Sequence, residues 1–275
     1  MSAALQAALE VALSAAQAAG QAIRTRWETS VTVRHKGEID LVTEADLEAE
    51  AAVVSRLRAA FPGDRIVAEE GGESGADAES GDRCWYVDPL DGTTNFAHGF
   101  PQFCVSITLA DAAGLAVGVV HAPIYGFTFS AVRGGGAFFS DGRGGPPARM
   151  SVSACPDLDH ALLATGFPYD ARTHPDNNVD RFGALLRQCQ GIRRAGSAAL
   201  DLAFVARGWL DGYWESRLKP WDIGAGCLLV AEAGGQVTTF AGGPADFRDG
   251  AVVVSNARFH VELCRALAAA RPLEK

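Results

Sequence analysis

The chain has 275 residues, of which 48% are hydrophobic, so it can bury a substantial core as one domain or two closely packed halves. Its 24 Lys and Arg residues against 33 Asp and Glu give a formal net charge of -9. This balance argues against a nucleic-acid surface, since affinity for a polyanion comes mainly from Lys and Arg. We therefore expect no nucleic-acid partner, while a small anionic substrate remains compatible because bound cations can invert the local field.

The cysteines and the N-terminus indicate a reducing compartment. The six cysteines never form a C-x-x-C pair, and most lie in apolar runs, so we interpret them as reduced and buried: Cys84, Cys104, Cys155, Cys189, Cys227 and Cys264. The N-terminal segment lacks the basic region of a signal peptide, and polar residues interrupt it too often for a membrane span. These features predict a cytoplasmic protein with no membrane association.

The first 63 residues predict two helices separated by a short strand. The stripe of larger apolar residues from Ala3 to Trp27 has helical spacing and predicts a packing helix. Strands are expected around Val31 and Val33 and from residue 39 to 42, with a turn at residues 36–38 between them. Thr43 then precedes a long helix that Phe61-Pro62-Gly63 ends, and Asp46 lies at the spacing of a capping box.

The chain is organised around residues 84–96. An apolar strand from Cys84 to Val87 is followed by Asp88-Pro89-Leu90-Asp91-Gly92-Thr93-Thr94-Asn95. Proline fixes its φ and lacks an N–H, so we expect a bend that aims both Asp side chains and the Leu90 carbonyl into one space. The N–H groups of Gly92, Thr93 and Thr94 can open a short helix that binds a phosphate. An ordinary type I turn is the alternative interpretation of D-P-x-D-G.

Two acids precede this stretch. A short strand at residues 66–68 delivers Glu69 and Glu70, followed by a loop at residues 71–82 that is rich in Gly, Ser and acids and is expected to be mobile. Carboxylates beside N–H groups that can hold a phosphate describe a metal-assisted phosphoryl-transfer site. Adjacent acids at a strand end are otherwise simply solvated charges.

The remaining pattern predicts sheets separated by helices, an α/β fold. Strands are expected at 103–110, 115–121 and 127–132, then a hairpin around 137–139 between turn glycines. Residues 143–151 look like a connection between an N-terminal half, 1–145, and a C-terminal half, 146–275. The C-terminal half predicts strands near 162, 192, 213–214, 236–240 and 252–255, and helices at about 178–188, 197–207, 222–233 and up to 270.

The string DPLDGTTNF at residues 88–96, together with Trp221-Asp222-Ile223-Gly224-Ala225-Gly226, resembles the two signatures of the inositol monophosphatase family of magnesium-dependent, lithium-sensitive phosphatases. The resemblance covers nearly the whole chain and implies a five-layer αβαβα sandwich, the fold of the inositol monophosphatase and fructose bisphosphatase type. Asp40-Leu-Val-Thr-Glu-Ala-Asp46 resembles the D-L-V-T-x-x-D motif of the family. Ala68 and Gly71 depart from its common G-E-E-S form around Glu69 and Glu70.

The resemblance implies a role for each matching position. It implies two Mg²⁺ ions, held by Glu69, Asp88, the Leu90 carbonyl, Asp91 and Asp222, with room for a third ion near Glu70 and Asp46. Asp222 is also at a helix N-cap position, and the two roles are compatible. The mechanistic hypothesis is in-line attack by a metal-activated water that Thr93 holds, with Asp46 as proton relay and Glu69 orienting the nucleophile. Gly92, Thr93 and Thr94 bind the phosphate.

The C-terminal half is expected to select the substrate. Residues 193–202 and 211–215 resemble the bacterial branch of the family, with Glu215, Ser197 and Ala198 at positions that bind inositol. The expected activity is hydrolysis of myo-inositol 1-phosphate. Histidinol phosphate, fructose 1,6-bisphosphate and phosphoadenosine nucleotides remain alternative substrates, because phosphatases for them share the metal motifs. A regulatory partner of the transcription machinery is the non-enzymatic alternative, and the family resemblance implies a homodimer.

Overall fold

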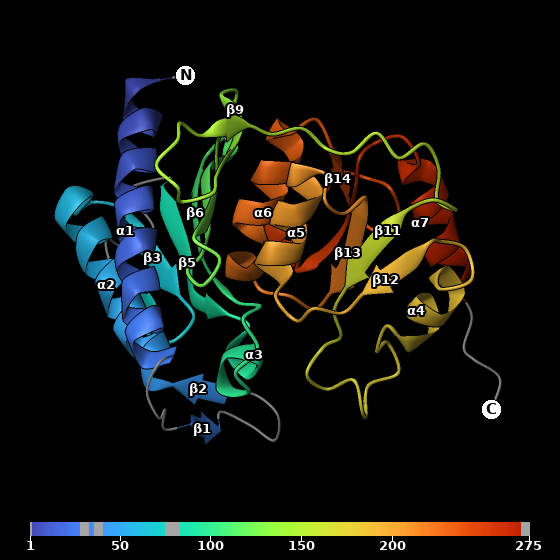
Figure 1. Ribbon diagram of the computed structural model, residues 1–275, viewed down its shortest axis with the longest axis horizontal. Coiled ribbons are helices and arrows are strands. Elements are labelled where there is room, and N and C mark those ends of the chain that lie inside the picture. The colour runs from blue at the N-terminus through green and yellow to red at the C-terminus, as the bar shows by residue number, and fades with distance from the viewer. Residues whose placement is uncertain (1, 28–32, 36–40, 75–82, 271–275) are drawn as a thin grey trace.

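A computed structural model describes residues 2–27, 33–35, 41–74 and 83–270. Its elements form five layers in the order helices, sheet, helices, sheet, helices (Figure 1), so the predicted αβαβα sandwich is confirmed. None of the helices in the described part of the chain is both long and apolar enough to cross a membrane. The expected turn at residues 36–38 and most of the loop at 71–82 lie outside the described residues.

The outer layer of the N-terminal half consists of α1 (Ala3–Trp27) and α2 (Glu44–Ala60), which pack on one face of an eight-stranded sheet. The capping box predicted for α2 is present, because Thr43 Oγ1 accepts a hydrogen bond from Ala45 N–H while the Asp46 carboxylate accepts from Thr43 N–H. A short ribbon of β1 (Val33–His35) and β2 (Leu41–Thr43) precedes α2.

The eight-stranded sheet has the order β10-β9-β8-β7-β6-β5-β3-β4. Most neighbours are antiparallel, and β3 and β5 are parallel. The strands are β3 (Arg65–Ala68), β4 (Gly72–Ser74), β5 (Cys84–Asp91), β6 (Cys104–Asp111), β7 (Gly114–Ala122), β8 (Phe127–Val132), β9 (Gly136–Ser140) and β10 (Ala148–Arg149). The short helix α3 (Thr93–Ala97) follows β5.

Three expectations for this sheet were wrong. The strand predicted to end at Val87 continues through Pro89 to Asp91, and the bend is a register shift against β6 between Asp88 and Asp91. A bulge accommodates a proline inside a strand because the ladder is already interrupted there. Gly72–Ser74, expected as loop, pairs with β3 as an edge strand, and the expected connection after residue 143 contains β10.

The C-terminal half supplies the other three layers. Its five-stranded sheet has the order β12-β11-β13-β15-β14 and consists of β11 (Leu162–Thr165), β12 (Gly191–Arg193), β13 (Gly212–Ser216), β14 (Gln236–Thr238) and β15 (Ala251–Ser255). Helices α5 (Ala198–Arg207) and α6 (Pro220–Glu232) lie between the two sheets, and α4 (Val179–Leu185) and α7 (His260–Ala269) cover the outer face (Figure 1). A 3₁₀ turn, η1 (Phe247–Asp249), precedes β15.

Glycines let α6 approach both of its neighbours closely. A Cβ atom on Gly118 of β7 would lie 2.9 Å from the Ala225 carbonyl oxygen, and one on Gly224 would lie 2.8 Å from the Thr108 side chain. On the other side, a Cβ on Gly226 would lie 2.4 Å from the Leu202 Cβ. The glycines of residues 222–226 therefore let α6 pack closely against the eight-stranded sheet on one side and against α5 on the other. This close packing fixes the position of the start of α6.

Candidate active site

A cavity of about 590 Å³ lies where the two halves meet. It brings together nearly all the residues that the sequence predicted for the site, although they are far apart in the chain. The predicted residues on its wall are Glu69, Asp88, Leu90, Asp91, Gly92, Thr93, Thr94, Ser197, Ala198, Glu215 and Asp222. Asp46 is not on the wall and lies behind Thr93, to which it is hydrogen-bonded.

The end of β5 supplies the first two carboxylates. Asp88 is buried, and its Oδ1 accepts a hydrogen bond of 2.9 Å from Leu90 N–H. Asp91 Oδ2 accepts from Ser197 Oγ and from Ala199 N–H of α5, both at 2.7 Å. Ser197, predicted to bind substrate, therefore supports a carboxylate of the other half.

Gly92 turns the chain from β5 into α3. Its φ of 102° is in the left-handed region, and a Cβ atom there would lie 2.8 Å from the Gln102 carbonyl oxygen. The turn leaves the first N–H groups of α3 without partners in the helix, as at every helix N-terminus. Gly92, Thr93 and Thr94 line the cavity at this point, so these N–H groups are placed to bind an anion there.

Thr93 links the cavity to α2. Its Oγ1 lies 3.0 Å from Asp46 Oδ1 and 3.1 Å from the Leu90 carbonyl oxygen, and it can donate to either. The other carboxylate oxygen of Asp46 accepts from Thr43 N–H at 2.8 Å and from Thr43 Oγ1 at 2.6 Å. The residue that caps α2 therefore also accepts a hydrogen bond from the cavity wall.

Asp222 lies in the first turn of α6. The N-cap position expected for it was wrong, because Lys219 is the N-cap and Asp222 is the third residue of the helix. Its Oδ2 accepts from Lys219 N–H at 2.7 Å, the bond that this third residue makes in a capping box. The preceding residue is held to the large sheet, because Ser106 Oγ donates to the Trp221 carbonyl at 2.9 Å. The start of α6 is thus fixed against β6, at the residue that pairs with Asp88 of β5.

These acids raise one another's pKa. Burial raises the pKa of Asp88 well above its ordinary value, and the charges of Glu69, Asp91 and Asp222 raise it further. Burial also raises the pKa of Asp222, and it raises that of Asp91 to about 6 against the hydrogen bonds from the start of α5. Burial also raises the pKa of Asp46, while its hydrogen bonds with Thr43 and Thr93 oppose this rise.

The donor set suits a hard cation in its chemistry. Glu69, Asp88, Asp91 and Asp222 offer carboxylate oxygens, and the hydrogen bonds from protein groups to the three aspartates engage one oxygen of each. Within residues 2–27, 33–35, 41–74 and 83–270, however, no group of three or more His, Cys, Asp or Glu side chains is already arranged to hold a metal ion. A cation here would have to draw these carboxylates together.

The C-terminal half forms the opposite wall. Glu215 is buried on β13, and its Oε2 accepts a hydrogen bond from the Tyr213 hydroxyl two residues earlier on the same face of the strand. Burial raises the pKa of Glu215 to about 7. The bare Cα of Gly166 packs against this carboxylate, since a Cβ there would lie 2.1 Å from Glu215 Oε2.

Sequence reasoning missed three polar residues of this site. Asp201 is 2% exposed and lines the cavity, and burial raises its pKa well above the ordinary value. Asn95 joins the halves, with its Nδ2 at 2.6 Å from the Gln102 carbonyl oxygen and 2.8 Å from that of Ala195. Nothing in the local sequence around Asp201 or Asn95 indicated that these residues belong to the site. The bond from Asn95 to Ala195 joins positions a hundred residues apart.

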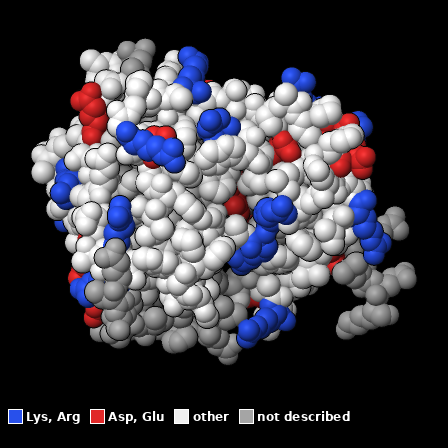
Figure 2. Space-filling view, in the orientation of Figure 1, with Lys and Arg blue, Asp and Glu red and all other residues white. Residues whose placement is uncertain are grey.

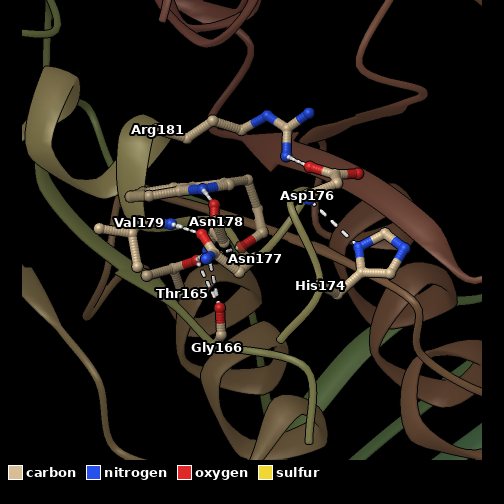
Figure 3. Close-up of polar contacts among 9 residues, drawn as sticks. Thr165, Gly166, His174, Asp176, Asn177, Asn178, Val179 and Arg181 are labelled. Atoms are coloured by element: carbon tan, nitrogen blue, oxygen red, sulfur yellow. Dashed lines mark hydrogen bonds and ion pairs between the residues drawn. The ribbon is translucent and has the colours of Figure 1, made fainter. Parts of the chain in front are cut away.

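Asn178 is the third missed residue, and it fixes the far wall (Figure 3). Its Nδ2 donates to Thr165 Oγ1 at 2.8 Å and to the Gly166 carbonyl at 2.7 Å, while its Oδ1 accepts from Trp214 Nε1 at 2.8 Å. It is buried with a φ of 70°, a conformation that Asn tolerates better than most residues. This amide therefore ties β11 to β13 directly beside Glu215.

Charge on the face shown in Figure 2 is dispersed. Lys and Arg side chains are spread singly over this face and do not gather in one patch, and acidic side chains lie between them. Four basic residues line the cavity itself, at its C-terminal side: Arg172, Arg194, Arg217 and Lys219. The cavity thus has acids from both halves and basic residues from the second half alone.

Comparisons with known proteins agree with this geometry. The model of the inositol monophosphatase family matches residues 4–271. The inositol-1-monophosphatase of Synechocystis sp. is 44% identical over 244 residues, 88% of this chain and 82% of that protein. Nus factor SuhB of Escherichia coli (strain K12) is 42% identical over 239 residues, 86% of each chain. The inositol monophosphatase structure from Anabaena (Nostoc) sp. PCC 7120 has a TM-score of 0.88 at 41% identity and covers 98% of both chains.

The layered fold and its relatives define a phosphoric monoester hydrolase. Because the family model spans nearly the whole sequence, the chain belongs to the inositol monophosphatase family.

Proposed function

We propose that this protein hydrolyses myo-inositol 1-phosphate to inositol and phosphate in a magnesium-dependent reaction. The single observation that carries the proposal is the cavity in which Glu69, Asp88, Asp91 and Asp222 meet the start of α3. If a substrate or cation drew the four carboxylates to roughly 5 Å from one another, they would repel by about 3 kcal/mol per pair at an effective dielectric of 20. Such a cluster is best explained by divalent cations, and oxygen ligands suit Mg²⁺.

The residues of the chain would share the remaining work. Mg²⁺ held by the four carboxylates and the Leu90 carbonyl would neutralise charge on the phosphate and on the leaving oxygen. The N–H groups of Gly92, Thr93 and Thr94 would hold the phosphate oxygens. The Thr93 hydroxyl would position the attacking water and pass its proton toward Asp46, while Glu69 orients the water.

The substrate assignment depends on the opposite wall. Glu215 would accept hydrogen bonds from ring hydroxyls, and Ala198 would line the pocket beside it. The Synechocystis relative is named for inositol 1-monophosphate hydrolysis, which favours the same substrate here. Histidinol phosphate, fructose 1,6-bisphosphate and phosphoadenosine nucleotides are the alternatives. We also propose two Mg²⁺ per subunit with room for a third, lithium sensitivity, a homodimer and a cytoplasmic location, all from the family resemblance.

A panel of these phosphate monoesters, assayed with Mg²⁺ and with or without lithium, tests the proposal. We expect the highest kcat/KM on inositol 1-phosphate and no activity for Asp88→Asn at any Mg²⁺ concentration. Asp159→Asn, at an exposed position that does not line the cavity, is the matched control and should behave as the wild type. Wild-type protein that hydrolyses none of the esters would refute the proposal.

Relatives named Nus factor SuhB favour a second candidate, a regulatory role with the transcription machinery. They include the proteins from Escherichia coli and from Pseudomonas aeruginosa, which are 42% and 44% identical to this chain. Co-purification with RNA polymerase under gentle conditions would support this role. If the role is separate from catalysis, Asp88→Asn should co-purify as well as the wild type does.

A further inference from the structure

Asp201 is a buried acid whose carboxyl group receives no hydrogen bond from the described part of the protein. It lies in the first turn of α5, is 2% exposed and lines the cavity. Among the described residues, no hydrogen bond or ion pair reaches its carboxyl group, and its oxygens are not fully enclosed by protein, so they face the open cavity. Buried carboxyl groups normally have such partners, so an unpaired one on a cavity wall points to a ligand that supplies them.

Other acids of the same region show what a partnered carboxylate looks like. Asp91 takes two hydrogen bonds of 2.7 Å from the start of α5. Asp211, which begins the turn into β13, accepts from Leu162 N–H at 2.6 Å on one oxygen and from Ser153 Oγ on the other. Both side chains hold pieces of the fold together, and Asp201 makes no comparable contact.

Asp201 shares its wall with a second acid. The charge of Glu215 acts on Asp201, and the positive charge of Arg194 acts on both acids in the opposite sense. All three residues come from the C-terminal half and line the cavity, and the charge of Asp91 at the end of β5 also acts on Asp201 and on Glu215. The wall thus presents two groups of carboxyl oxygens and one guanidinium, which together can accept from and donate to hydroxyl groups.

We propose that Asp201 is a substrate-binding residue that, together with Glu215, selects polyhydroxylated leaving groups such as cyclitols and sugars. The proposal rests on the function proposed above and identifies Asp201 as a residue that binds the hydroxyl groups of the leaving alcohol. A ring with several hydroxyls would give the Asp201 carboxyl the partners that the protein does not. A simple alkyl phosphate would leave the Asp201 carboxyl without a hydrogen-bond donor, and sites built to bond a substrate hydroxyl discriminate strongly against analogues without it.

The test compares two esters whose leaving alcohols are both aliphatic, inositol 1-phosphate and ethyl phosphate. The variants are Asp201→Leu and Asp201→Asn, which remove the charge at similar volume, and Asp211→Asn is the matched control. For Asp201→Leu we expect kcat/KM on inositol 1-phosphate to fall about 10- to 100-fold, the range for a lost hydrogen bond to a charged group, with a change below about threefold on ethyl phosphate. Asp201→Asn should lose less, since its amide can still bond hydroxyls.

The stability of the variants distinguishes a binding role of Asp201 from a structural one. If Asp201 held the fold together, its replacement would lower the denaturant midpoint. Both Asp201 variants should unfold at the same or a higher denaturant midpoint than the wild type, because they remove an unpaired buried carboxyl. Asp211→Asn should unfold earlier and keep the wild-type ratio of the two kcat/KM values. Equal losses on both esters, or a destabilisation of Asp201→Asn as large as that of Asp211→Asn, would overturn the proposal.

Binding of the product alcohol separates this proposal from the proposed hydrolysis. Free myo-inositol should raise the melting temperature of the wild type in a saturable way and should fail to do so for Asp201→Leu. If the wild type hydrolyses neither ester but shows this shift, the hydrolase proposal fails and hydroxyl binding at Asp201 stands. If inositol shifts both proteins equally, the role of Asp201 is refuted even when turnover is normal.

Discussion

Replacement of Thr93 by alanine tests the proton path from the cavity to α2. The hydroxyl lies 3.0 Å from Asp46 Oδ1, while the other oxygen of Asp46 keeps its two bonds to Thr43. Loss of a hydrogen bond to a charged group costs about 1.5–3 kcal/mol, or about 10- to 150-fold in rate. A general base that can no longer be reached costs about 10²- to 10⁴-fold. We therefore expect kcat to fall by between about 10² and 10⁴.

The assay measures kcat on inositol 1-phosphate at saturating Mg²⁺ and, separately, the Mg²⁺ affinity by calorimetry. Thr93 contributes no carboxylate, so the affinity should change by less than about threefold. Thr93→Ser keeps the hydroxyl and should retain activity within about tenfold of the wild type.

Thr43→Ala is the matched control for Asp46. It removes the α2 cap and one bond to Asp46 Oδ2, and should cost about 1 kcal/mol in the free energy of unfolding. It leaves the Thr93 contact in place, so its kcat should fall less than that of Thr93→Ala. Parallel losses of kcat and Mg²⁺ affinity in Thr93→Ala would refute the reasoning, because they would place Thr93 in the metal site and not on a proton path.

Three further predictions follow from the described contacts. Asn178→Ala should lower the free energy of unfolding by about 3 kcal/mol in urea denaturation, because it leaves the Trp214 indole N–H and the Gly166 carbonyl without their partner; Asn177→Ala should cost clearly less. The raised pKa of Glu215, about 7 against 4.5, means that the folded state binds the extra proton, so metal-free protein should lose stability as pH rises from 4.5 to 7. Glu215→Gln should flatten that slope, and an unchanged slope would contradict the assignment. Mg²⁺ should raise the melting temperature of metal-free protein more than Na⁺ at equal ionic strength, since it relieves the repulsion around Asp88, and chelation should reverse the shift.

The sequence predicted elements best where one local signal sufficed. The stripe of α1, the Thr43 cap of α2 and the alternating apolar strands β6 to β8 each follow from spacing within a few residues. Edge strand β4 could not be predicted in this way, because Gly72-Glu73-Ser74 has low β-propensity and is a strand only through its pairing with β3. The extension of β5 through Pro89 likewise depends on the register with β6.

In the candidate site too, the residues in local motifs were predicted and those defined by long-range contacts were not. The acids were found because motifs carry them, and the structure gathers them on one cavity wall. The partners of those acids were not found: Ser197 was expected to face substrate, and its hydroxyl bonds Asp91 across 106 positions of sequence. Asn178 lies in a run of Pro, Asp and Asn that predicts only a turn, and its role appears only when β11 and β13 are adjacent.

Because the two halves of the chain contribute different sides of the site, substrate specificity can change through residues of the C-terminal half. In the proposed function, the phosphate and cation side consists of the ends of β3 and β5 together with Asp222 of α6, and the alcohol side consists of α5 and β13. The two sides are coupled where Ser197 bonds Asp91 and where Asn95 bonds the Ala195 carbonyl. If Asp201 binds the alcohol as proposed, its substitution should change the preferred alcohol more than the rate on a simple ester. Ser197→Ala removes a donor from a carboxylate of the phosphate side, so it should slow hydrolysis of every ester by a similar factor.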